Sequence, residues 1–192
     1  PDLRWNRDSL NEVSKIEYLA DRLPRNMGPY DVVEDEHASM LGEKQWQWLE
    51  QELLKPSKIK VIGSSLQLLP EFTGWESWAN FPRDRERLLT FIAKHKISGV
   101  IMISGDTHWG EVSYVKNQEG YGLWEVTSSG LSEKWKDVSP NKHRVGAYTH
   151  DVNYGFIEVD WQQHDPLIAI GLKDVKGNIF SQQQFRLSSL GS

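Results

Sequence analysis

The stretch Val100-Ile-Met-Ile-Ser-Gly-Asp-Thr-His-Trp-Gly-Glu111 joins a short apolar run to two residue types that bind metal ions in many proteins. The apolar run, Val100 to Ile103, predicts a strand that is buried on both faces. Asp106 and His108 follow the end of this strand directly. In an extended segment, side chains two positions apart point the same way. We therefore expect the carboxylate and the imidazole to project together from the carboxyl end of the strand, where ligands bind in open α/β sheets.

A simpler role for these two residues is also open. Asp106 could cap a turn, and His108 could be a half-buried histidine whose hydrogen bonds are satisfied within the fold. For an isolated Asp-x-His pair this is the commoner situation. The position of the pair directly after a buried strand favours a binding site.

A second strand, expected at residues 59–63, precedes a helix that begins near Pro82, a residue suited to the first helical turn. The helix carries an apolar stripe made of Leu88, Leu89 and Ile92. Together with the strand at 100–104, these elements predict a βαβ unit with parallel strands.

Parallel strands would bring several polar groups to one rim. The residues that follow the earlier strand would emerge beside the Asp-x-His pair, and they include Ser64, Ser65 and Gln67. The long loop at 68–81, which carries Trp78 and Asn80, starts from the same edge. Two strand ends and one long loop therefore predict a site at this rim.

The remaining segments predict one further helix and five strands. The helix spans Gly42 to Leu54 and is stopped by Lys55-Pro56. The strands are expected at residues 112–115, 122–127, 155–161, 167–172 and 180–187. We expect these strands to form an antiparallel meander that continues the sheet. The sequence shows no repeat and no internal boundary, which predicts a single domain over residues 1–192.

Composition excludes some partners and restricts the chemistry. The chain has 22 basic and 27 acidic residues and scattered basic pairs, so no nucleic-acid-binding patch is expected. It contains no run long enough for a transmembrane segment. Because it has no cysteine, oxygen and imidazole would have to hold any metal ion. The chain opens with Pro1 rather than Met, which favours a fragment or a processed product.

The residues alone leave several reaction types open. Ser64 or Ser65 with His108 would suit acyl transfer, although the sequence has no Gly-x-Ser-x-Gly elbow. Glycoside cleavage could use a pair of carboxylates, chosen from Glu71, Glu76 and Asp106. A tryptophan-rich binding module without catalysis is a further possibility, since the chain has nine tryptophans.

Several blocks of the sequence resemble, in their order, those of alkaline phosphatase D-like (PhoD-like) metallophosphoesterases. The blocks are Leu41–Glu50, Ser64–Pro70, Glu76–Pro82, Ser104–Glu111 and Thr127–Leu131. Asp2-Leu-Arg4 is also similar to an Asp-Thr-Arg block of that family, with Leu3 in place of threonine. The resemblance implies a calcineurin-like α/β fold, in which two β-sheets pack face to face between helices and metals lie at the sheet edge.

The resemblance also implies roles for individual residues. Asp106 and His108 would be catalytic metal ligands, in a site that holds iron and calcium in some family members. Apart from the resemblance, the position of Glu111 just past His108 suits a carboxylate that orients the imidazole. Related phosphoesterases place a metal-binding histidine where this chain has Ser64, Ser65 and Gln67, so the resemblance gives these residues proximity to the substrate side but no ligand role. Trp78, Asn80 and Arg144 would line the substrate side, with the Arg144 guanidinium neutralising phosphate charge.

The amino-terminal aspartate and asparagine blocks of the family have no counterpart in this chain. We therefore expect residues 1–192 to be the carboxy-terminal portion of the fold: one βαβ unit followed by the meander. The expected function is phosphoric ester hydrolysis by a metal-activated hydroxide, of the alkaline phosphatase or phosphodiesterase type, with a site that is incomplete in this chain. The alternative is a catalytically inactive remnant or a partner-binding domain of the same fold.

The resemblance implies a phosphate ester as the substrate and an extracytoplasmic or secreted location. The face left by the missing half would favour self-association.

Overall fold

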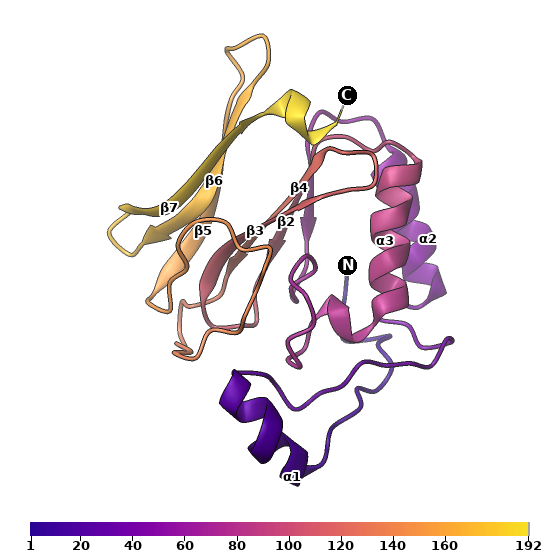
Figure 1. The fold of residues 1–192 in the computed structure, drawn as a ribbon. Helices are drawn as coiled ribbons and strands as arrows, with labels where there is room; N and C mark the ends of the chain where they lie inside the picture. Colours follow the sequence, from indigo (N-terminus) through magenta and orange to yellow (C-terminus); the bar gives the residue numbers. More distant parts are fainter. Residues whose placement is uncertain (192) are drawn as a thin grey trace.

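The computed structural model describes residues 1–191 and shows a three-layered α/β arrangement (Figure 1). One layer holds two helices, α2 (Glu43–Leu54) and α3 (Pro82–Lys94). The middle layer is a four-stranded sheet made of β1 (Lys60–Gly63), β2 (Val100–Ser104), β3 (Gly110–Lys116) and β4 (Gly122–Ser128). The third layer is a three-stranded sheet made of β5 (Asn153–Asp160), β6 (Leu167–Asp174) and β7 (Ile179–Arg186).

Short helical turns complete the secondary structure. They are α1 (Lys15–Glu17), η1 (Tyr18–Arg22), η2 (Leu23–Arg25), η3 (Trp78–Asn80) and η4 (Leu187–Leu190). Within the described residues, no helix combines the length and the apolar character needed to cross a membrane.

The two predicted helices are confirmed at nearly the expected bounds. Helix α2 buries Trp46, Leu49 and Leu53, which recur at helical spacing. Helix α3 begins at Pro82, and its Asp84 carboxylate accepts hydrogen bonds from the backbone N–H of Met40 and the indole N–H of Trp46. This carboxylate therefore fixes the two helices and the preceding loop to one another.

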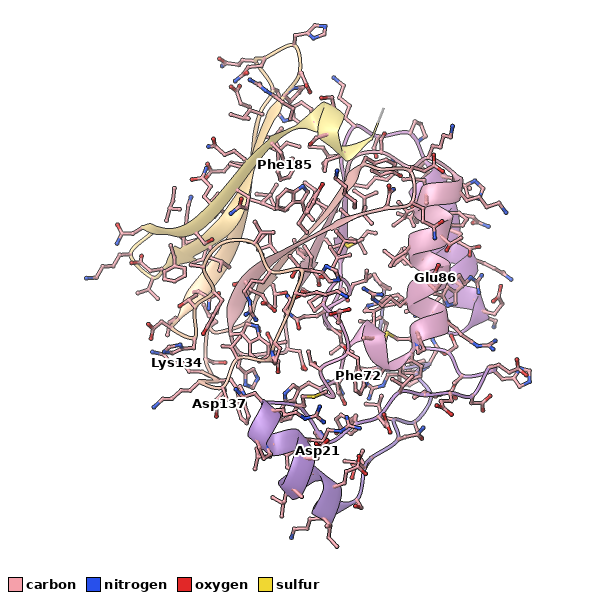
Figure 2. The ribbon with its side chains drawn as sticks, in the orientation of Figure 1. Asp21, Phe72, Glu86, Lys134, Asp137 and Phe185 are labelled. Atoms are coloured by element: carbon pink, nitrogen blue, oxygen red, sulfur yellow. The ribbon has the colours of Figure 1, made fainter. Side chains whose placement is uncertain are left out.

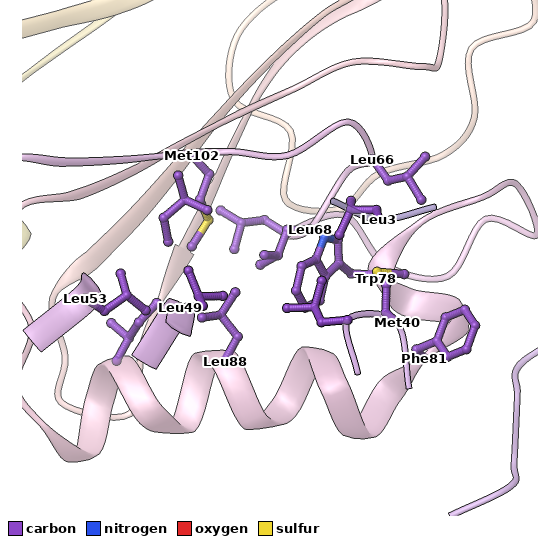
Figure 3. Close-up of a cluster of buried hydrophobic side chains, with 14 of the residues drawn as sticks. Leu3, Met40, Leu49, Leu53, Leu66, Leu68, Trp78, Phe81, Leu88 and Met102 are labelled. Atoms are coloured by element: carbon purple, nitrogen blue, oxygen red, sulfur yellow. The ribbon is translucent and has the colours of Figure 1, made fainter. Parts of the chain in front are cut away.

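The strand alternation of β2 divides the core into two clusters. Val100 and Met102 face the helices and pack with Leu88 and Trp78 (Figure 3). Ile101 points the other way, into a cluster that includes Ile168 and other residues of the second sheet. The expectation of a strand buried on both faces holds for its first three residues, but Ile103 is 40% exposed.

The predicted βαβ unit is confirmed, since β1 and β2 pair in parallel around α3. The expected meander is corrected in two respects. Strand β4 lies between β2 and β3, parallel to the first and antiparallel to the second, so both of its edges are hydrogen-bonded within the sheet. Strands β5, β6 and β7 form a separate sheet that packs on the first one and does not extend it.

One close backbone contact positions two distant loops. A β-carbon on Gly28 would lie 2.3 Å from the carbonyl oxygen of Gly74, so only glycine allows this approach. The backbone N–H of Gly28 donates to Thr73, and that of Tyr30 donates to Gly74. These bonds place Tyr30 next to the loop that carries Trp75, beyond the carboxyl end of β2.

Candidate functional site

A pocket of about 330 Å³ lies beyond the carboxyl end of β2, and both Asp106 and His108 line it. Arg4 and Glu76 contribute further charged groups, and the aromatic side chains come from Tyr30, Trp75, Trp109 and Trp135. The pocket is therefore built from the amino-terminal segment, three loops and the turn after β2.

The Asp-x-His pair reaches this pocket through a turn, which corrects the extended geometry expected from the sequence. The backbone of Asp106 has a φ of 72° and that of His108 a φ of 61°, both in the left-handed region. The His108 backbone N–H donates to the Ser129 hydroxyl at 2.8 Å, and the His108 carbonyl accepts from the backbone N–H of Trp135. Neighbouring loops therefore hold the turn in a conformation that is uncommon for residues other than glycine.

Charged groups surround Asp106. Arg4 lies 3.0 Å from one Glu76 carboxylate oxygen and 3.7 Å from an Asp106 oxygen, and Arg7 lies 3.2 Å from Glu76. Partial burial raises the pKa of Asp106, and the nearby Glu76 carboxylate raises it further, while Arg4, His108 and Arg7 oppose this shift. A cation in the pocket would stabilise the ionised form of Asp106.

The number of possible metal ligands is small. Among residues 1–191, no group of three or more histidine, aspartate and glutamate side chains is arranged to hold a metal ion. The chemistry of Asp106 and His108, a carboxylate and an imidazole, suits divalent and trivalent metals. Two donors alone fall short of the four or more ligands that such ions take.

Glu111 and Arg144 form a buried ion pair instead of the expected separate roles. Glu111 is 1% exposed and accepts hydrogen bonds from Arg144, from Gln67 at 2.7 Å and from the indole of Trp109 at 3.1 Å. Arg144 also donates to the Ser139 carbonyl at 2.7 Å. Arg144 therefore pairs with Glu111 and Ser139 and does not line the Asp106 pocket.

The hydrogen bonds that the structure gives Glu111 do not include one from His108. Any influence of Glu111 on the Asp-x-His turn would therefore act through Trp109, the residue that follows His108.

The other expected substrate-side residues are mostly buried. Trp78 and Asn80 are fully buried, where the Trp78 indole donates to the Ser64 hydroxyl and the Asn80 side chain caps η3. Gln67 and Ser64 are also buried, while Ser65 is exposed but does not line the Asp106 pocket. None of these five residues lines the Asp106 pocket.

Sequence reasoning missed Tyr30 and Trp135, and it gave Arg4 no role at the site. These residues come from loops without periodicity, and long-range contacts set their positions. One such contact is the hydrogen bond from the Ser139 hydroxyl to the Asn26 carbonyl. In Figure 2, Lys134 and Asp137 mark the loop that carries Trp135, and Asp21 marks the segment below it.

A second cavity, of about 590 Å³, lies between the two sheets beside β5. Its apolar lining includes Ile103, Leu131, Phe156 and Ile157. Strand β5 is an edge strand of its sheet, and β1 is an edge strand of the other. Residues of both edge strands line this groove, Gly63 from β1 and residues 153–157 from β5.

A family model for PhoD-like phosphatases matches residues 2–166. The chain belongs to the PhoD-like phosphatase family. A solved structure of PhoD has the same general fold, with a TM-score of 0.58 and 15% sequence identity. The match covers 95% of this chain but only 40% of the PhoD chain, so the present chain spans less than half of that protein. No curated protein sequence matches the chain. The resemblance to the PhoD-like family is thus confirmed.

Proposed function

We propose that this chain is the carboxy-terminal portion of a PhoD-like, metal-dependent phosphoesterase, and that Asp106 and His108 are metal ligands. The observation that carries the proposal is their shared pocket beyond the end of the parallel strand β2. The family match supports a phosphoric ester as the substrate. The extracytoplasmic location of the complete protein is part of the same proposal.

The residues present fit part of a metal site. Asp106 and His108 would hold a metal, iron or calcium by family resemblance, and the remaining ligands would come from outside these 192 residues. When bound, the metal would polarise the phosphoryl group and lower the pKa of a water molecule for attack on phosphorus.

Arg4 has a separate role in this proposal. Its guanidinium lines the pocket and its side chain is 58% exposed, so it can face a phosphate directly. It is ion-paired with Glu76 and lies 3.7 Å from Asp106 in the present structure. Binding of a phosphate ester would place negative charge beside this guanidinium, and the arginine would orient the ester by charge-assisted hydrogen bonds.

The groove beside β5 supports the proposal of an incomplete calcineurin-like sandwich. The amino-terminal part of the fold would cover Ile103 and Phe156 and pair with the free strand edges. In its absence, the same apolar surface would favour self-association.

Metal binding tests the site directly. The free Mn²⁺ signal in electron paramagnetic resonance, titrated with the 192-residue chain, should fall through weak, saturable binding. His108→Ala and Asp106→Asn should each abolish this binding. His95→Ala is the matched control, because His95 ends helix α3 and does not line the pocket. Equal binding by the wild-type and His108→Ala chains would overturn the proposed site.

Activity tests the completeness of the site. With only two protein ligands, the chain should show little hydrolysis of p-nitrophenyl phosphate when iron and calcium are added. Robust turnover that is abolished by His108→Ala would show that the 192 residues already contain a whole site. Metal binding without turnover, even after the remaining family sequence is supplied, would favour an inactive remnant.

A further inference from the structure

We infer that the site takes phosphate esters whose alcohol is a flat aromatic ring, held by Trp75 and Trp135. This inference rests on the proposed function, because it assigns the part of the substrate that extends away from the phosphate. Trp75 and Trp135 line the same pocket as Asp106 and His108. The pocket volume of about 330 Å³ exceeds what a bare phosphate needs and falls in the range of about 300–1,000 Å³ typical of sites for small organic ligands.

The two tryptophans form a corner. Their ring centroids are 5.5 Å apart and their planes meet at 76°. A third planar ring fits such a corner with its face against one indole and its edge against the other, an arrangement that aromatic groups favour. The perpendicular rings therefore favour an aromatic ligand.

The corner adjoins the charged end of the pocket. Trp75 directly precedes Glu76, which is ion-paired with Arg4. The Trp135 backbone N–H donates to the His108 carbonyl at 3.2 Å. An ester whose phosphate lies between Arg4 and His108 would therefore place its alcohol group against the two indoles.

The charges of the pocket argue against a cationic alcohol such as choline. Aromatic cages bind quaternary ammonium groups through cation–π attraction. Here the carboxylate of Glu76 is already ion-paired with Arg4 and Arg7, and that of Asp106 lies within 3.7 Å of Arg4. The proposed metal ion and the guanidinium of Arg4, which also lines the pocket, would together repel a further cation. A neutral ring meets no such repulsion.

Isothermal titration calorimetry on the 192-residue chain tests this assignment. The probes are 1-naphthyl phosphate, glycerol 2-phosphate and phosphocholine, each measured with Mn²⁺ and again with EDTA. We expect 1-naphthyl phosphate to bind about tenfold more tightly than the other two. In Trp135→Ala, the dissociation constants of the three probes should become similar, because 1-naphthyl phosphate loses its extra affinity. Trp161→Ala is the control, because Trp161 is also exposed but lies at the far end of β5.

The outcomes distinguish a failure of the aromatic subsite from a failure of the proposed metal site. If the naphthyl preference persists in EDTA and needs Trp135, the aromatic subsite stands even where Mn²⁺ binding fails. The inference is overturned if 1-naphthyl phosphate does not bind, if phosphocholine binds as tightly, or if the preference survives Trp135→Ala. Trp75→Ala provides a second variant, since it removes the other wall of the corner and should likewise abolish the naphthyl preference.

Discussion

The backbone at Asp106 and His108 is left-handed at both positions, within one short turn. This conformation costs about 1–2 kcal/mol for residues with a β-carbon. Aspartate and histidine are among the side chains that adopt it most often, but two in one turn is unusual. Strained residues persist where the surrounding structure holds them, and they cluster at functional sites. The turn therefore supports the proposal that these two side chains are needed in the pocket.

The strain can be measured at position 108. We expect His108→Gly to be more stable than His108→Ala by about 1 kcal/mol, because glycine adopts a positive φ without a clash. Urea unfolding of both variants would give the difference. At His95, where φ is −90°, the alanine variant should be at least as stable as the glycine variant. An alanine variant that is the more stable one at position 108 would contradict the left-handed turn.

The ion pair between Glu111 and Arg144 offers a second test at single residues. Arg144→Met would leave the Glu111 carboxylate buried without its partner, so we expect a loss of about 3 kcal/mol in the free energy of unfolding. The double variant with Glu111→Gln should recover most of this loss. Urea unfolding of the four proteins in the cycle would show whether the two positions are coupled. Additive effects would mean that the pair has no structural role.

The segment between β1 and η3 is anchored from both sides. The Glu125 carboxylate on β4 accepts the backbone N–H groups of Leu68 at 2.9 Å and Leu69 at 2.6 Å. Arg85 on α3 donates to the carbonyl oxygens of the same two residues. Burial of Glu125 raises the pKa of its carboxyl group, and the nearby Glu111 charge adds to the shift.

This raised pKa predicts how stability depends on pH. Above the ordinary glutamate pKa, the unfolded chain releases the Glu125 proton before the folded chain does. The folded state then binds more protons, so the Glu125 contribution to stability falls as pH rises from the unfolded pKa to the folded pKa. Glu125→Gln should remove this slope, as followed by urea unfolding at a series of pH values. If the free energy of unfolding depends on pH in the same way for the wild-type and Glu125→Gln chains, the raised pKa of the Glu125 carboxyl group is contradicted.

The apolar groove beside β5 predicts association of the chain with itself. Val61 and Ile103 are 52% and 40% exposed on neighbouring strands of the first sheet. We expect Ile103→Lys to shift the chain toward monomer in sedimentation velocity, with little change in stability. Val175→Lys is the control, since Val175 is exposed in the turn between β6 and β7. Identical sedimentation of both variants would contradict self-association through the groove.

The spacing of apolar residues predicted the helices and strands but not the order in which the strands pair. The spacing of Trp46, Leu49 and Leu53 predicts α2, and alternation predicts β5, because both depend on residues close in sequence. The place of β4 between β2 and β3 depends on which strand edges form backbone hydrogen bonds with each other, and alternation does not contain that information. The same limit explains why Arg144, expected at the substrate, is paired with Glu111 across the fold.

In the whole molecule, two sheets and one helical layer (Figure 1) support the Asp-x-His turn, which follows β2 and lines the pocket. Family membership rests on a match to residues 2–166, whereas the chain spans only 40% of the PhoD structure that resembles it. The pocket, the groove and the free strand edges are consistent with one proposal, in which further sequence completes both the metal site and the sandwich.

Paramagnetic broadening by Mn²⁺ tests the metal site most directly. In proton–nitrogen NMR spectra of the chain, substoichiometric Mn²⁺ should first broaden the His108 imidazole and the indole signals of Trp109 and Trp135, which line the pocket. The indole signal of Trp161, at the other end of β5, should stay sharp. Broadening centred away from Asp106 and His108, or uniform across all indoles, would contradict the proposed metal site.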